Sequence, residues 1–112
     1  MESAKSRQLL LRIVGAFPFF QAEWLADNEG RATATFSQHS VWMSFLPYVA
    51  RLELDTRQLK HLASLVNDSV AAGEDSENAV STCFLEGISR SSELGKSLWP
   101  TLSPASRISW QG

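Results

Sequence analysis

Apolar residues recur every three or four positions through the middle of the sequence, and this spacing predicts helices. The most regular apolar stripe consists of Leu59, Leu62, Ala63, Val66 and Val70. Asp55 or Thr56 can cap the start of this helix, and Gly73 suits its end. A polar run after the glycine supplies a short turn. We therefore expect a central hairpin of two antiparallel helices, over residues 55–73 and 77–89.

The second helix of this hairpin has apolar residues around a wide arc. They are Ala79, Val80, Cys83, Phe84, Leu85 and Ile88. Because so wide an arc contacts more than one neighbour, we expect this helix near the middle of the domain. Gly87 would allow another backbone to come close to it.

Shorter apolar patterns predict further helices on both sides of the hairpin. They cover residues 3–17, 19–26, 37–52 and 91–98. Pro18 ends the first of these, while Pro47 either kinks the third or lies in its first turn. We expect a turn and then a loop or extended segment over 27–36, and irregular structure over 101–112. The sequence thus predicts one all-α domain of about five helices, spanning residues 1–112.

The composition and net charge of the chain limit which classes of partner we expect it to bind. The chain has 112 residues, of which ten are basic and twelve acidic, so its net charge is −2. Neither a nucleic-acid backbone nor an anionic membrane is a natural partner for such a charge. Cys83 is the only cysteine, which excludes an internal disulfide and suits a reducing cytoplasm. Four tryptophans suit a small core and an interface equally well.

Residues that often carry chemistry are scarce. Cys83 could act as a nucleophile with His61 as its base, but its position on the apolar arc favours a buried thiol in the core. Two histidines, His39 and His61, are too few for a metal site. No glycine-rich loop precedes a helix, so we expect no cofactor, no metal, no catalytic residue and no enzymatic activity.

Acidic residues are concentrated around the predicted hairpin. Between His61 and Ser89 there are five acidic residues and no lysine or arginine. Four of them are the candidate partner-binding residues: Asp68, Glu74, Asp75 and Glu77. An acidic surface can steer and bind a basic protein partner. The alternative is a solvated face with helix-capping carboxylates.

The hairpin sequence also resembles a known family. The segment from Asn78 to Glu86, NAVSTCFLE, is similar to the signature of short, all-helical bacterial proteins. The resemblance is strongest over residues 54–89 and extends to the tryptophan-containing segment 98–110. Pro47 departs from the family's pattern. Members include immunity proteins of polymorphic toxin systems, small cytoplasmic proteins that each bind and block one cognate toxin.

The resemblance implies a non-enzymatic immunity protein that binds a bacterial effector toxin and blocks its active site. Two alternatives remain open at this point. A structural adaptor or secretion chaperone would bind its partners through an exposed Trp or Phe patch. A small hydrolase or transferase would use Cys83 and His61. Salt dependence of binding separates charge recognition from an apolar surface.

Overall fold

Seven α-helices and two short 3-10 helices form the part of the chain that the computed structural model describes, residues 3–27 and 36–111. Their bounds are α1 Ser3–Ala16, α2 Phe20–Asp27, α3 Gln38–Ala50, α4 Thr56–Ala72, α5 Glu74–Cys83, η1 Leu85–Gly87, α6 Glu93–Leu98, η2 Trp99–Thr101 and α7 Pro104–Gln111. The all-α prediction is confirmed, but the helices are more numerous than the expected five or so. The predicted turn and loop over 27–36 lie mostly outside the described residues.

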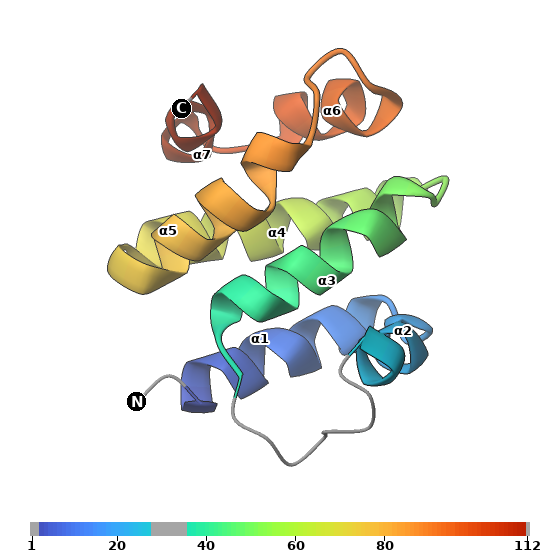
Figure 1. Cartoon of the computed structure of the whole chain (residues 1–112). Helices are drawn as coiled ribbons and strands as arrows, with labels where there is room; N and C mark the ends of the chain where they lie inside the picture. The colour runs from blue at the N-terminus through green and yellow to red at the C-terminus, as the bar shows by residue number, and fades with distance from the viewer. Residues whose placement is uncertain (1–2, 28–35, 112) are drawn as a thin grey trace.

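The helices are arranged around α3, α4 and α5. Figure 1 shows these three in the middle, with α1 and α2 on one side and α6 and α7 on the other. The closest packing joins α5 to α3 and to α4. Helix α5 also contacts α7, which agrees with the expectation that this helix has several neighbours. No helix in residues 3–27 and 36–111 is long and apolar enough to cross a membrane.

The central hairpin forms largely as predicted. Asp55 caps α4, because its side chain accepts a hydrogen bond from the Gln58 amide at 2.7 Å and the Gln58 side chain bonds back to the Asp55 amide at 3.0 Å. The second helix was predicted over 77–89, and this range is wrong at both ends. Helix α5 begins at Glu74 and ends at Cys83, after which Phe84 leaves helical geometry with φ −129°.

Glycines allow close packing beside η1 and α6. A Cβ added to Gly87 would lie 2.5 Å from the Leu46 side chain, so its close neighbour is a side chain and not the expected backbone. The close backbone approach is found at Gly95 instead. A Cβ there would lie 2.1 Å from the Ser89 carbonyl oxygen.

Helix α3 is continuous from Gln38 to Ala50 and contains Pro47 in its interior. The proline therefore does not lie in the first turn of a helix that begins near Phe45, which was the other possibility. Ser37 caps its first turn by accepting a hydrogen bond from the Ser40 amide at 3.1 Å. Pro47 has no amide to donate to the Met43 carbonyl. Met43 and Pro47 are both exposed, so the proline lies on the solvent side of α3.

Aromatic rings fill the space between α1, α2, α3 and α5. We call Phe17, Phe20, Trp42, Phe45, Tyr48 and Phe84 the aromatic layer, and all six are buried. The centroid of the Phe45 ring lies 5.3 Å from that of Phe17 and 5.1 Å from that of Phe20, and both pairs have edge-to-face geometry. Such contacts add to the free energy of burial.

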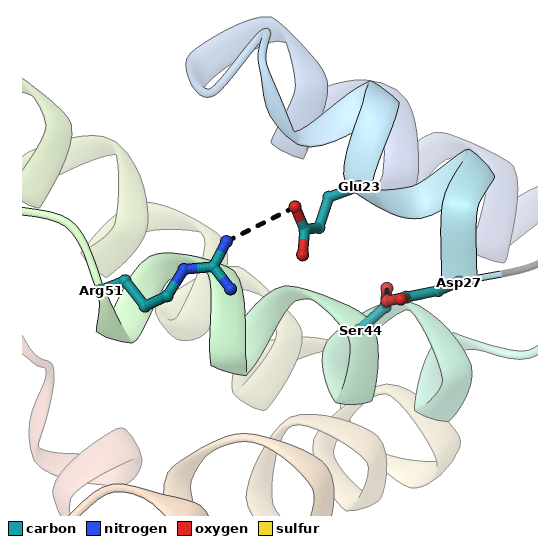
Figure 2. A network of polar contacts seen from close by, with 4 residues as sticks. All are labelled: Glu23, Asp27, Ser44 and Arg51. Carbon is teal, nitrogen blue, oxygen red and sulfur yellow. Dashed lines mark hydrogen bonds and ion pairs between the residues drawn. The ribbon is translucent and has the colours of Figure 1, made fainter.

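Polar contacts fix α2 against α3 outside the aromatic layer. The Arg51 guanidinium lies 3.4 Å from the Glu23 carboxylate, and the Ser44 hydroxyl donates a hydrogen bond to the Asp27 carboxylate (Figure 2). Each contact joins the C-terminal end of one helix to the middle of the other: Arg51 follows α3, and Asp27 is the last residue of α2. They orient α2, and we assign these four residues a structural role.

Residues 101–112 were expected to be irregular, and this prediction is wrong. Helix α7 starts after Ser103, whose hydroxyl accepts a hydrogen bond from the Ser106 amide at 3.2 Å, with Pro104 in the first helical position. Leu102 and Trp110 are buried, as expected of residues that hold this segment to the body. Ile108 was expected to do the same but is exposed.

Candidate functional site at the two ends of helix α5

The N-terminal end of α5 is a tight acidic turn, which we call the hairpin tip, residues 73–77. Gly73 has φ 73° and ψ −173°, a conformation that is almost restricted to glycine. Glu74 follows with φ 50°, which is uncommon for a residue with a side chain. Hydrogen bonds from the Gly73 amide to the Val70 carbonyl and from the Glu77 amide to the Gly73 carbonyl fix the turn.

The four predicted partner-binding residues are placed around this tip in different ways. Glu74 and Asp75 are exposed, and neither forms an ion pair within the described part of the chain. Asp68 lies 2.9 Å from the Arg12 guanidinium on α1. Glu77 is half-buried and accepts a hydrogen bond from the Ser109 hydroxyl on α7 at 2.9 Å. Of these four residues, only Glu74 and Asp75 are therefore open to a partner without a competing contact.

The C-terminal end of α5 contains a cysteine–histidine contact that the sequence did not indicate. The Cys83 sulfur lies 3.2 Å from Nδ1 of His39, in the first turn of α3. Cys83 was expected to be sealed in the core, and this is wrong, because α5 ends at this residue and leaves the side chain half-buried. The pairing with His61 is also wrong, since His61 is exposed on α4.

The surroundings of this contact limit what the thiol can do. Thr82 lies 3.6 Å from the sulfur, but its hydroxyl donates to the Asn78 carbonyl. A thiolate would lie at the C-terminal end of α5, where the helix carbonyls disfavour an anion. Within the described residues, no group hydrogen-bonds to the other ring nitrogen of His39 to orient the imidazole. The contact therefore lacks the third member that activates a nucleophile in catalytic sites.

Tryptophans do not form an exposed patch. Trp24, Trp42 and Trp110 are buried, and Trp99 is half-buried with the Arg90 guanidinium 4.4 Å from its ring centre. Three of the four rings therefore belong to the core. Among residues 3–27 and 36–111, no group of three or more His, Cys, Asp or Glu side chains is placed to hold a metal ion.

Comparison with known proteins gives a family but no activity. A family model described as a domain of unknown function, DUF7674, matches residues 10–112. The chain belongs to this family. The matched region contains the whole aromatic layer, the hairpin tip and the Cys83–His39 contact, so all of these features lie inside the family's domain. No curated protein and no solved structure matched the chain.

The contact between His39 and Cys83 was not predicted from the sequence, and no local signal indicates it. The contact joins residues 44 positions apart, so no motif spacing connects them. A serine at position 37 predicts a helix start, but not which first-turn side chain would meet Cys83. Only the packing of α5 against α3 brings the two residues together.

Proposed function

We propose that this chain is a non-enzymatic binding protein, and most concretely an immunity protein of the bacterial cytoplasm that neutralises one effector toxin. The observation that carries the proposal is the hairpin tip, where Glu74 and Asp75 are exposed, adjacent and without an ion pair in the described residues. The tip would bind basic groups that line the toxin's active site or substrate groove. Binding there would exclude the toxin's substrate.

The rigidity of the tip supports this role. Its backbone is held by hydrogen bonds at Gly73 and Glu77, and Ser76 within it is buried. A preorganised loop loses little conformational entropy on binding, so more of the interaction energy appears as affinity. Glu74 retains a left-handed conformation that glycine would adopt with less strain. A strained residue at an exposed position is typical of a functional site.

Asp68 and Glu77 would have secondary roles in the same complex. The Arg12–Asp68 ion pair is largely exposed, with side chains 49% and 58% accessible, and exposed pairs contribute only about 0–1 kcal/mol. Asp68 can therefore exchange Arg12 for a basic group of the partner. Glu77 is held by Ser109 and would present its carboxylate in a fixed direction. The four acidic residues together would also increase the association rate.

The test is co-expression with the toxin-domain protein encoded by the neighbouring gene, followed by growth rescue and calorimetry on the purified complex. The double variant Glu74→Lys and Asp75→Lys should reduce affinity at least about thirtyfold, or about 2 kcal/mol. Glu53→Lys with Glu93→Lys is the matched control, because these exposed acidic residues line one pocket beyond the opposite end of α4. The control pair should leave affinity within about threefold of the original value.

Three results decide between the proposals. No rescue and no complex with any neighbouring toxin would end the immunity interpretation. A complex whose affinity is unaffected by salt would favour the adaptor alternative, because charge recognition weakens with ionic strength. Equal losses of affinity in the two double variants would show that the net charge of the protein, and not the hairpin tip, determines binding.

A second candidate is supported by the Cys83–His39 contact. A hydrolase or transferase would use Cys83 as the nucleophile and His39, in place of His61, as the base. Cys83→Ser and His39→Ala would each abolish such an activity while leaving toxin binding intact. The position of the thiol at the C-terminal end of α5 makes this the weaker proposal.

A further inference from the structure

A groove of about 290 Å³ lies between α1 and α2, two helices that contact each other on one side of the molecule (Figure 1). Its apolar lining consists of six side chains: Leu10, Leu11, Val14, Trp24, Leu25 and Phe36. Trp24 is buried and packs edge-to-face against Phe36, with the ring centroids 4.9 Å apart, so the two rings support each other in the lining. Neither the family match nor the hairpin tip accounts for this groove.

Helical spacing makes the lining continuous. On α1 it begins at Arg7 and continues three, four and seven residues later, which places it on one side of the helix over two turns, roughly 10 Å. On α2 it begins at Gln21 and continues at Trp24 and Leu25, three and four residues later. The groove is therefore a strip of apolar side chains between two helices, with one polar residue at the start of each stripe.

Part of this apolar lining faces solvent. Leu11 is 64% exposed and Leu25 is 38% exposed, and they are two of the five large apolar side chains that are exposed in the described part of the chain. Single exposed apolar residues are common on protein surfaces. Two of them in the lining of one groove form a patch that an apolar ligand can cover.

Arg7 is the charged residue in the lining, and it indicates the sign of the ligand's polar group. It forms no ion pair with another of the described residues. Helix α1 contains no acidic residue, and the two acidic residues of α2, Glu23 and Asp27, already contact residues on the α3 side. A guanidinium can bind both oxygens of a carboxylate, so an occupant with one carboxylate matches this single positive charge.

We propose that the groove binds a medium-chain fatty acid, a carboxylate with an unbranched chain of about eight carbons. The chain would cover Leu11 and Leu25, and the carboxylate would pair with Arg7. The volume equals that of about ten water molecules in the liquid, which suits a ligand of about ten non-hydrogen atoms. A standard protein interface covers about 800 Å² of each partner, far more than two turns of α1 beside one turn of α2. The groove shares no residue with the hairpin tip, so the proposal does not depend on the immunity function.

The experiment is an NMR titration of the full chain with octanoate, 1-octanol and octylammonium, each in monomeric form and at constant ionic strength. Octanoate should shift the backbone amide signals of Leu11, Val14 and Leu25 and saturate them. 1-Octanol should bind at least about fivefold more weakly, and octylammonium more weakly still, because neither can pair with Arg7. No saturation with octanoate would overturn the proposal. Equal affinity for octanoate and 1-octanol would overturn the assignment of a carboxylate ligand.

The same titration distinguishes a site from general adsorption of hydrocarbon. Met43 and Ile108 are 62% and 73% exposed and lie outside the groove, so their amide signals should not saturate together with those of the groove. Hexanoate should bind at least about threefold more weakly than octanoate, because two fewer CH₂ groups are buried. Equal shifts at Met43 and Ile108, or equal affinity for the two chain lengths, would contradict binding of the chain in the groove.

Variants of α1 test the role of the positive charge. Arg7→Gln should weaken octanoate binding at least about fivefold and leave 1-octanol binding within about twofold of its original value. Lys5→Gln is the matched control, because Lys5 is an exposed cation outside the lining and lies roughly 200° from Arg7 around the helix. The control should change octanoate affinity less than about twofold. Similar losses in the two variants would show that octanoate senses only net charge, and the groove would not be its site.

A substitution at Leu11 tests whether the ligand and Arg7 meet in the groove. Leu11→Glu places a carboxylate four residues after Arg7, within reach of the guanidinium, and should abolish octanoate binding. Leu11→Gln is the control, because it is similar in size and brings no charge, and it should retain measurable binding. Leu11 is exposed, so both variants should fold. Unchanged octanoate affinity in Leu11→Glu would overturn the proposal.

Discussion

Two regions on opposite sides of α4 and α5 are held together by different forces. The aromatic layer joins α1, α2, α3 and α5 through buried rings, such as the Trp42 and Phe84 rings at 4.7 Å. Helix α7 is attached by one buried ring, Trp110, together with several single hydrogen bonds. Asn67 on α4 accepts hydrogen bonds from the Ser103 amide at 2.9 Å and the Ser106 hydroxyl at 2.7 Å. The Trp110 indole donates to the Ile88 carbonyl at 3.2 Å.

The difference indicates how each region responds to damage. Apolar burial is spread over many atoms and is cooperative, so losing one ring weakens the whole body. Hydrogen bonds concentrate the attachment of α7 on a few atoms, so losing one should release a single helix. We therefore expect global unfolding from changes in the aromatic layer and local opening from changes at α7.

The largest effect is expected for Phe45→Ala. The Phe45 ring is fully buried and contacts the rings of Phe17, Phe20 and Phe84, so its removal should lower the free energy of unfolding by about 3–5 kcal/mol. Urea denaturation followed by circular dichroism measures this change. Phe19→Ala is the control, because Phe19 is 84% exposed, and its effect should stay within about 0.5 kcal/mol. Similar losses in the two variants would remove the basis for a ring-built core.

An intermediate effect is expected for Asn67→Ala. The change leaves the Ser103 amide and the fully buried Ser106 hydroxyl without their acceptor, which should lower stability by about 1–3 kcal/mol. Hydrogen exchange should accelerate in α7 and remain slow in α3. Asn78→Ala, at an exposed asparagine whose side chain makes no hydrogen bond in the described residues, is the control. Acceleration spread evenly over all helices would contradict the distinction between the regions.

The two regions also differ in how far the sequence predicted them. The apolar stripe that includes Leu62 and Val66 predicted α4 correctly, because helical periodicity indicates which face of a helix is buried. Helix α7 was missed because it has only eight residues, although Ser103 followed by Pro104 is a helix-start signal. The attachment of α7 through Asn67 could not be predicted. In the sequence, a polar residue off the apolar stripe looks the same whether its side chain faces water or forms a hydrogen bond with another helix.

The candidate sites show the same limit. The exposed carboxylates Glu74 and Asp75 were predicted from local composition, because acidic residues after a helix-ending glycine lie in a turn. The contact between Cys83 and His39 depends on two helices packing together and has no local signal. The buried side-chain nitrogen of Gln38 has no hydrogen-bond partner among the described residues, and this too is visible only in three dimensions. Sequence therefore predicts the exposed residues of one turn, and not the contacts that form between helices.

The smallest effect is expected for Trp110→Phe, which removes the indole N–H and leaves the Ile88 carbonyl unpaired while keeping an aromatic ring. A loss of about 1 kcal/mol should follow, with faster exchange in α7 alone. Trp99→Phe is the matched control, because Trp99 is half-buried and phenylalanine still offers a ring face to Arg90. A loss in Trp110→Phe no larger than that in the control, in both stability and exchange, would contradict a role for this buried indole in holding α7. A larger loss of stability than in the control, with faster exchange confined to α7, would show that the buried Trp110 indole, through its ring and its hydrogen bond to the Ile88 carbonyl, secures this helix.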